Sequence, residues 1–488
     1  SLRVEIAGAR LGTNGKGASR EFALASAYAE LMERLQNHIL YLECDLSPEV
    51  LNYGGFYFSP DEKYMSAGEL LEAGGPLLDK MVPEALPPAA AALSPLLHKK
   101  AREWFGLDLP DSPGYDRLEF ARRWTVCNQD WFPCDFVARP FYSLRNDSLC
   151  YVPLQMGFIP YGSNGMCAGN TPEEALVQGF SEIFERYANR EIMLKKITPP
   201  TVPEAYLEKY PRLHSLLKNI ETEGKLHVLV KDCSLGRGLP VLGLAVIDRE
   251  KQSYSVQLGA HPVFAIALER CITELLQGRR LHDTLKSFMT TFNFADRRLN
   301  HPENMGNIFK MGVGSYPAEF FSGRCSYEFT EFKDMSAADN RQMLRHCAGL
   351  LLEQGCDVLI RDVSHLGFPS YFIIVPGVSE ISEYDEAVLG VMDLLKQSRL
   401  ILRNPGQATG EELRKVVSYL LRRLGRRLET DNLGQVLGLP LKSSFPWLKK
   451  PILYFVAAAL YKMNKPKEAL GMMNQLLAAM ENRVSAPG

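Results

Sequence analysis

The 488-residue sequence has no apolar run long enough to span a bilayer, which takes roughly 20 residues. It also has no basic start followed by an apolar centre, as a secretory signal peptide would. Its formal net charge is only -2 at pH 7, so bulk charge gives no reason for binding to nucleic acid or membranes. We therefore expect a cytoplasmic protein that binds neither directly.

Several familiar metal and phosphate motifs are absent as well. The ten cysteines form no C-x-x-C pair, and the nine histidines show no H-E-x-x-H spacing. Free thiols in a reducing compartment are the simplest interpretation, and we expect Cys167 to serve packing and His261 to be structural. The G-x-x-x-x-G-K-[ST] phosphate loop is missing too, because Gly15-Lys16-Gly17 lacks its spacing and its Ser/Thr.

The most informative stretch runs from Asn164 to Tyr187 and reads NGMCAGNTPEEALVQGFSEIFERY. It predicts a helix capped by Thr171, with Pro172 in the first helical position and Glu174 completing a capping box. Apolar side chains occupy most of its circumference. One face carries a polar stripe, formed by Glu174, Gln178, Glu182 and Glu185. Such a stripe is either a solvated edge or a row of carboxylates that faces an enclosed polar site.

In this stretch, Ala175-Leu176 is followed by five residues and then by Glu182, and two other segments repeat this spacing. They are Asn14 to Leu35 (NGKGASREFALASAYAELMERL) and Ala267 to Arg279 (ALERCITELLQGR). The matching glutamates are Glu30, Glu182 and Glu274, and the polar residues one turn earlier are Ser26, Gln178 and Arg270. In the first repeat, Glu33 and Arg34 also correspond to Glu185 and Arg186. Three helices with polar groups in register are expected to converge on one site, and their irregular spacing does not indicate a solenoid.

Strand and helix patterns at hairpin-like spacing predict an α+β fold, with a layered mixed sheet and helices, rather than a regular βαβ series. We expect strands from residues 226, 240, 357 and 370, helices over 203–223, 262–280 and 337–353, and a polar, loop-rich segment over 281–335. From residue 404 onward the patterns are helical, and the turn at Asn464-Lys465-Pro466 resembles a tetratricopeptide-type (TPR-like) hairpin. The predicted domains are 1–403, which holds the site, and 404–488, a helical appendage that packs on the main domain or on a second subunit.

The paired carboxylates indicate a cation site. Glu30 with Glu33, and Glu182 with Glu185, bring together four like charges that cannot all stay ionised without cations. Oxygen ligands in this number favour Mg²⁺, which usually joins protein carboxylates to substrate phosphates. Nearby arginines can pair with spare carboxylates or with those phosphates. The residues thus predict a Mg-nucleotide or Mg-phosphate site, although salt-bridged helices around a polar core would explain the same pattern.

The three repeats, with HLGFPSYFIIVPGVSEI at residues 365–381, resemble signature segments of the YcaO superfamily. Within it they most resemble the branch of the founding protein, which does not form azolines, and the resemblance covers Gly12 to Ile381. It implies that ATP and Mg²⁺ bind between clustered glutamates, which would be Glu30, Glu33, Glu182 and Glu185. It further implies nucleotide-binding roles for Asn170, Glu174, Gln178, Arg186, Arg270, Ser26 and Arg20.

The same resemblance implies an ATP-utilising enzyme that modifies a peptide or protein, and a homodimer. This branch is associated with β-methylthiolation of a ribosomal small-subunit protein, so an accessory factor with a methylthiotransferase partner is the favoured function. Two alternatives remain open: a thioamide- or azoline-forming synthetase on a ribosomally made peptide, and a nucleotide-binding scaffold with little turnover. The chain also departs from the family pattern. After the segment that corresponds to Gly15-Lys16-Gly17, the relative in this branch has a second Lys, where this chain has Glu21. The C-terminal Ser485-Ala486-Pro487-Gly488 is unlike the proline-rich tail of azoline-forming members, which weighs against cyclodehydration.

Overall fold

The computed structural model of the chain describes two compact units. Apart from single positions elsewhere, it describes residues 2–6, 9–13, 19–37, 59–66, 136–154, 160–276, 289–292, 302–321, 323–381, 405–424 and 450–484. The first unit contains Ser1–Asn37, Phe141–Leu149 and Phe158–Ser382, and the second contains His38–Pro140, Cys150–Gly157 and Glu383–Gly488. Antiparallel sheets and separate helices confirm the predicted α+β class. The division into 1–403 and 404–488 stays a prediction.

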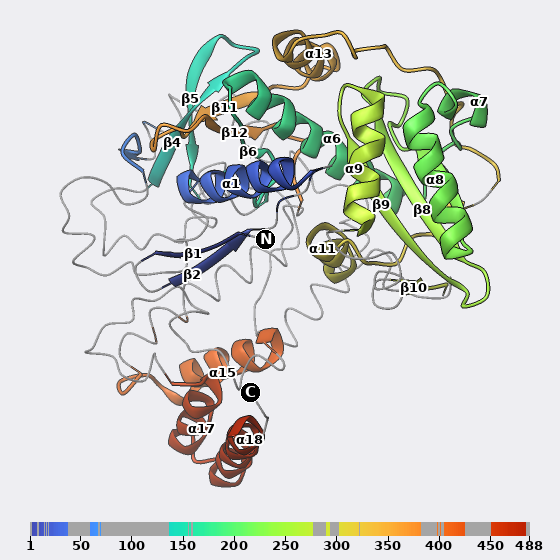
Figure 1. Cartoon of the computed structure of the whole chain (residues 1–488). Helices are drawn as coiled ribbons and strands as arrows, with labels where there is room; N and C mark the ends of the chain where they lie inside the picture. The colour runs from blue at the N-terminus through green and yellow to red at the C-terminus, as the bar shows by residue number, and fades with distance from the viewer. Residues whose placement is uncertain are drawn as a thin grey trace. The chain divides into compact units, whose positions relative to one another are not determined.

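A four-stranded antiparallel sheet forms one half of the first unit (Figure 1). Its order is β10–β9–β8–β7, with bounds Thr290–Thr291, Ser253–Ala260, Val241–Asp248 and His227–Asp232. Strands β7 and β8 confirm the predictions from residues 226 and 240. Strand β9 was not predicted, because SYSVQLGA lacks a long apolar run although every one of its residues is buried. It pairs with β8 along its whole length, from Val241↔Ala260 to Asp248↔Ser253.

A second antiparallel sheet in the first unit contains the strands predicted from residues 357 and 370. They are β11 (Leu359–Asp362) and β12 (Ser370–Ile374). Strand β12 pairs with β6 (Met166–Ala168), and β11 pairs with the last residues of β4 (Phe136–Ser143). Next to β4 lies β5 (Ser148–Pro153). At the N-terminus, β1 (Leu2–Ile6) and β2 (Ala9–Thr13) form an antiparallel hairpin.

The three repeated segments form helices on these two sheets. Helix α1 (Arg20–Gln36) packs on β6 and β12, and α9 (Phe264–Leu276) packs on β9 and β8. Between them α6 (Pro172–Lys195) contacts β6 and β12 as well as β8 and β9, so it joins the two sheets (Figure 1). This helix is buried on most sides because apolar residues occupy most of its circumference. The sheets therefore place the polar stripe of α6 between α1 and α9.

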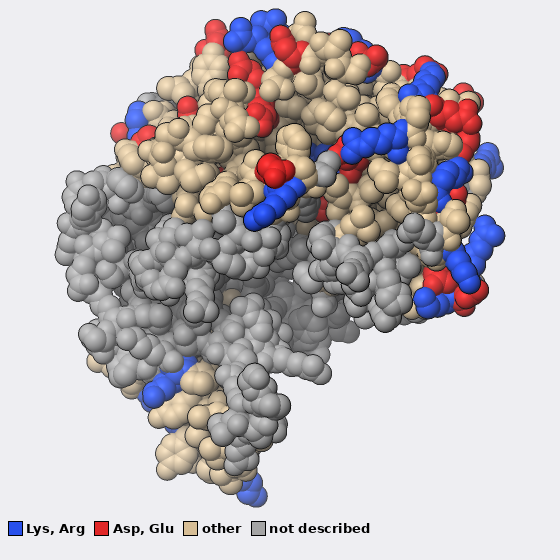
Figure 2. All heavy atoms as spheres, in the orientation of Figure 1, with Lys and Arg blue, Asp and Glu red and all other residues tan. Residues whose placement is uncertain are grey.

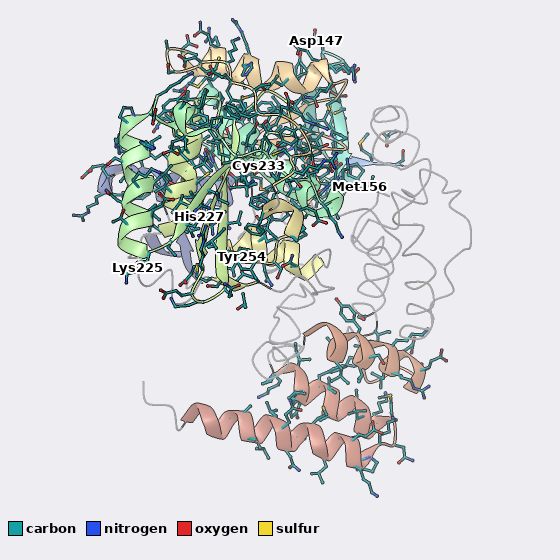
Figure 3. All side chains as sticks on the ribbon, turned by 90° about the vertical axis from the view of Figure 1, so that its right-hand side faces the viewer. Asp147, Met156, Lys225, His227, Cys233 and Tyr254 are labelled. Carbon is teal, nitrogen blue, oxygen red and sulfur yellow. The ribbon has the colours of Figure 1, made fainter. Side chains whose placement is uncertain are left out.

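The apolar interior lies on both faces of the β7–β10 sheet. Figure 3 shows Cys233 and Tyr254 inside the first unit, where they are 0% and 2% exposed in a cluster shared with α6. Lys225 lies at the edge of the unit in the same view, just before β7 begins. The opposite face of the sheet packs against α9 and α8 (Pro211–Gly224). Both faces of the sheet are thus covered, which explains why its central strands are buried at almost every residue.

One prediction for the middle of the chain was wrong in detail. The helix expected over 203–223 is two helices, α7 (Glu204–Leu207) and α8. The break lies at Tyr210, with φ -123 and ψ 69, because the proline that follows disfavours the helical conformation there. The loop-rich segment 281–335 also contains α11 (Pro302–Met311) and α12 (Ala318–Phe321). The helix expected over 337–353 is confirmed as α13 (Asn340–Glu353).

In the second unit, three helices pack around a separate apolar cluster. They are α15 (Gly410–Leu424), α17 (Ile452–Lys462) and α18 (Pro466–Val484). The predicted turn between α17 and α18 is present, with Asn464 at φ +62. The short strand β3 (Lys63–Met65) of this unit pairs with the first residues of β4. Among the described residues, none of the helices combines the length and apolarity that crossing a membrane requires.

Candidate functional site

Helix α1 is anchored at both ends. The Ser19 Oγ accepts a hydrogen bond from the Phe22 N–H at 3.3 Å, which caps the helix. At the other end, Gln36 is 2% exposed and is bonded on both sides of its amide to the β11–β12 loop. Its Nε2 donates to the Phe368 carbonyl at 2.8 Å, and its Oε1 accepts from the Leu366 N–H at 2.7 Å. These bonds hold the glutamates of α1 in place beside β12.

The start of α6 confirms the predicted cap but corrects the capping box. Thr171 Oγ1 accepts from the Glu174 N–H at 3.2 Å, and Pro172 occupies the first turn. The Glu174 carboxylate does not return to the cap backbone. It accepts from the side-chain amide of Asn170 at 3.0 and 3.1 Å instead, because that amide lies within reach of both carboxylate oxygens. Asn170 and Glu174, both predicted nucleotide-binding residues, are therefore held together at the helix entrance.

A glycine allows α6 to lie directly on the sheet. A Cβ at Gly179 would stand 2.8 Å from the Cys167 Sγ and 2.9 Å from the Ile373 Cδ1, both closer than van der Waals contact permits. Cys167 is fully buried here, and its thiol hydrogen-bonds to the Tyr371 carbonyl at 3.7 Å. Burial first, and then Glu33 and Glu182, raise the pKa of this thiol well above its usual value. Cys167 is thus a neutral packing residue, as expected.

The carboxylates of α1 and α6 meet around Glu33. Burial raises the pKa of Glu33 well above its usual value, and Glu182 and Glu30 raise it further. The guanidinium groups of Arg34 and Arg186 oppose this only in part, because each is already bonded to another glutamate. Arg34 pairs with Glu30 at 2.6 Å, and Arg186 pairs with Glu182 at 2.7 Å. The structure therefore brings together residues that stand about 150 positions apart in the sequence.

The carboxylates of α6 and α9 meet around Glu185. Burial raises the pKa of Glu185 to about 7, with Glu274 and Glu182 adding to the effect and Arg270 opposing it. Arg270 also donates a hydrogen bond to the Gln178 Oε1, so the polar positions that matched in the repeats are in direct contact. Glu274 was not among the predicted site residues. Its position in the Ala-Leu-x5-Glu repeat was the signal that could have identified it.

The other two predicted residues of α1, Arg20 and Ser26, lie nearer the start of the helix than its glutamates. Arg20 is exposed in the first turn, and Ser26 is half-buried. No contact within the described residues joins either side chain to the glutamates.

Arg186 of α6 also lies over the Phe309 ring, with 5.7 Å between its guanidinium carbon and the ring centroid. Its side chain therefore contacts both the carboxylates and α11.

These residues fit a divalent cation that is bound together with a ligand. Glu33 and Glu185 form no ion pair in the part of the chain that the structure describes. Burial and neighbouring carboxylates raise the pKa of both and so disfavour their ionisation. Nor do any three described His, Cys, Asp or Glu side chains group closely enough to hold a metal ion by themselves. Mg²⁺ commonly takes only one or two protein carboxylates and completes its shell with phosphates and water. The donor set therefore suits Mg²⁺ that arrives with a phosphate ligand.

Charge elsewhere on the first unit is mixed. On the face shown in Figure 2, the described Lys and Arg side chains are interspersed with Asp and Glu, without a broad patch of one sign. Ion pairs account for part of this mixture, such as Arg341 with Glu173 at 3.1 Å and Lys209 with Glu331 at 2.7 Å. Glu33 and Glu185 differ from such pairs, because neither forms an ion pair with a described residue and burial raises the pKa of both.

Two relatives of known sequence match most of this chain. One is an uncharacterised protein of Haemophilus influenzae, 31% identical over 376 residues, which are 77% of this chain and 58% of that protein. The other is the ribosomal protein S12 methylthiotransferase accessory factor YcaO of Escherichia coli K12. It is 31% identical over 369 residues, which are 76% of this chain and 57% of that protein. The chain thus spans less than two thirds of the length of either relative.

Solved structures of similar proteins are more distant. A heterocyclase in complex with substrate and cofactor has a TM-score of 0.47 and 19% identity, covering 77% of this chain and 46% of that one. The YcaO structure from Methanopyrus kandleri bound with AMPPCP and Mg²⁺ has a TM-score of 0.41 and 17% identity, covering 79% of this chain and 83% of that one.

A profile of the YcaO family, described as ATP- and Mg²⁺-binding cyclodehydratases, matches residues 14–379. This range is 366 of the 488 residues and includes all three repeat helices. The chain therefore belongs to the YcaO family of ATP- and Mg²⁺-binding, cyclodehydratase-type enzymes.

Proposed function

We propose that this protein uses ATP and Mg²⁺ in the modification of a protein, as an accessory factor for β-methylthiolation of a ribosomal small-subunit protein. The observation that carries the proposal is the unbalanced negative charge where the glutamates of α1, α6 and α9 meet. Family membership supports the nucleotide and the metal. The name of the Escherichia coli relative, 31% identical, supports the methylthiolation role.

Within this site, Glu33 and Glu185 are the best candidates for direct Mg²⁺ ligands. Their pKa values are raised by burial and by neighbouring carboxylates, so a cation would relieve an existing repulsion. Glu30 and Glu182 already pair with Arg34 and Arg186, and they would complete the set by exchanging part of that pairing for the metal. When bound, Mg²⁺ would supply charge neutralisation and orientation of the phosphates.

The proposed nucleotide contacts lie on the same faces of the helices. Arg270 bonds to Gln178 through one guanidinium nitrogen, which leaves its other N–H groups for phosphate oxygens. Arg186 likewise pairs with Glu182 through one guanidinium nitrogen, and its other N–H groups could donate to phosphate oxygens. Asn170 and Glu174 are joined at the entrance of α6. Two residues of α1, Arg20 and Ser26, would approach the ligand from the other side.

A second candidate function follows from the description of the family as cyclodehydratases. ATP would activate a backbone amide oxygen of a ribosomally made peptide, and an azoline or thioamide would result. The carboxylate cluster would serve this reaction equally well, because the metal and the phosphates occupy the same place in both cases. The identity of the substrate, and not the architecture of the ATP site, separates the two functions.

The helices of the second unit are proposed to serve assembly. Helices α15, α17 and α18 share their own apolar cluster, as a TPR-like hairpin with a supporting helix would. We propose that they mediate a homodimer or dock a methylthiotransferase. Deletion from residue 404 should then change the mass measured by light scattering more than it changes ATP affinity. Unchanged mass with lost ATP binding would instead place this segment at the nucleotide site.

We propose a cytoplasmic location, which suits ATP use and free thiols such as Cys167 and Cys233.

One experiment tests the enzymatic proposal. The wild type, Glu33→Gln and the exposed control Glu331→Gln are incubated with Mg²⁺ and ATP, with and without ribosomal protein S12, and the nucleotides are separated. We expect steady release of ADP or AMP from the wild type and the control, and little from Glu33→Gln. Mass spectrometry of S12 from cells that carry each variant should show the methylthio group missing only with Glu33→Gln. Saturable ATP binding without turnover would overturn the enzymatic proposal in favour of a scaffold.

A further inference from the structure

His261 occupies the junction between β9 and α9, beside the proposed nucleotide site. Its backbone N–H donates to the Pro240 carbonyl at 3.2 Å, and its ring Nδ1 accepts from the Val263 N–H at 3.0 Å. The first bond ties the residue to the start of β8, and the second turns the ring toward the first turn of α9. One bond thus fixes the backbone of His261, and the other fixes the orientation of its ring.

The ring is neutral at physiological pH. Burial, together with the nearby positive charge of Arg270, lowers the pKa of His261 to about 4. A neutral imidazole carries one proton, and the bond from Val263 occupies Nδ1 as an acceptor, so the proton lies on Nε2. His261 therefore presents an N–H donor on the side of the ring opposite Val263.

The neighbours of the ring place it at the contact between α6 and α9. Arg270 is close enough to shift the titration of the ring, and it reaches across to the Gln178 Oε1. Val263 packs against a small apolar cluster that includes Val177, the residue that precedes Gln178. Within the described part of the chain, the Nε2 of His261 has no hydrogen-bond partner. A polar, half-buried donor next to a partly satisfied arginine is suited to an anionic acceptor.

We propose that the His261 Nε2–H donates a hydrogen bond to a phosphate oxygen of the bound nucleotide, next to Arg270. The inference rests on the proposed nucleotide site and adds a residue that the sequence predicted to be structural. A neutral donor gives direction to the phosphate without competing with Mg²⁺ for the surrounding glutamates. The competing explanation is that the ring serves only to hold the first turn of α9 through Val263.

Two substitutions separate the two roles. In His261→Asn, the side-chain oxygen can still accept from the Val263 N–H, as in an Asx turn, but nothing reaches the position of Nε2. In His261→Gln, the longer amide can place an N–H near the position of Nε2, but the bond from Val263 is lost. A role in ligand binding therefore predicts loss of affinity in His261→Asn. A purely structural role predicts loss of thermal stability in His261→Gln with normal affinity in His261→Asn.

Calorimetry with Mg–AMPPCP, an analogue that is not hydrolysed, measures affinity, and thermal melting measures stability. We expect His261→Asn to bind roughly tenfold more weakly, about 1.4 kcal/mol, with a melting temperature close to that of the wild type. We expect His261→Gln to recover most of the affinity while melting lower. Adenosine, which has no phosphate, should bind the wild type and His261→Asn equally. Wild-type affinity of His261→Asn for Mg–AMPPCP would overturn this inference alone. A wild type that binds no Mg–AMPPCP would overturn the proposed function with it.

Discussion

Replacing Glu185 by Gln should stabilise the ligand-free protein above pH 7 and weaken its binding of Mg–nucleotide. Burial raises the pKa of Glu185 to about 7, from an ordinary value of 4.5. At about 1.4 kcal/mol per pH unit, this difference corresponds to at most about 3.5 kcal/mol. The side chain is half-buried and Arg270 opposes the repulsion, so we expect a gain of about 1–3 kcal/mol in the free energy of unfolding.

The gain should depend on pH in a defined direction. Below about pH 4.5 the carboxyl is protonated in both the folded and the unfolded state, so the wild type and Glu185→Gln should be equally stable. Between about pH 4.5 and 7 the unfolded carboxyl ionises while the folded one keeps its proton. The wild type therefore loses stability relative to the variant as pH rises through this window, and the difference is constant above it.

Thermal melting of both proteins at pH 4.5 and pH 8, without nucleotide, measures this difference. The exposed Glu331→Gln variant is the control and should follow the wild type at both values. Calorimetry at pH 8 should then show weaker Mg–AMPPCP binding by Glu185→Gln despite its higher melting temperature. Equal melting differences at the two pH values, or a variant that melts below the wild type at pH 8, would refute the reasoning.

Three further substitutions test the neighbouring structure. Arg186→Lys keeps the charge but loses the planar fork, so calorimetry should show roughly tenfold weaker ATP binding with an unchanged melting temperature; normal binding would reduce Arg186 to a helix-surface ion pair. Gly179→Ala should lower the free energy of denaturant unfolding by about 1–3 kcal/mol, since the clash with Cys167 at 2.8 Å outweighs a helix-propensity gain of about 1 kcal/mol; higher stability would mean that α6 can move off the sheet. Asp339→Ala removes a complete capping box from α13 and should cost about 1 kcal/mol without changing ATP affinity, and a loss of affinity would contradict this.

Local signals made parts of the fold predictable. Thr171 and Pro172 gave the start of α6 to the residue, because a cap and a first-turn proline act through their immediate neighbours. Strand β9 could not be predicted in the same way. Its small and polar residues are buried because α9 approaches Gly259, where a Cβ would stand 2.6 Å from the Ala267 carbonyl oxygen. That contact belongs to the packing of the whole sheet, and no short window of sequence contains it.

The sequence predicted which helix faces carry the polar residues of the candidate site, but not which side chains of different helices lie next to each other. The repeats matched Gln178 with Arg270, and the structure shows the two side chains in contact. The approach of Glu274 to Glu185 depends on the angle at which α9 crosses α6, which the spacing of residues along one helix does not contain. The capping box at Glu174 was wrong for a similar reason, since its partner is chosen by the conformation of the preceding loop.

Calorimetry of ATP binding with and without a divalent cation tests the proposed Mg²⁺ site most directly. The unbalanced glutamates around Glu33 and Glu185 should oppose a bare triphosphate through like-charge repulsion. We predict little heat when ATP is titrated in the presence of EDTA, and saturable binding once excess Mg²⁺ is added. Strong ATP binding in EDTA would contradict the claim that these carboxylates form the Mg²⁺ part of a nucleotide site.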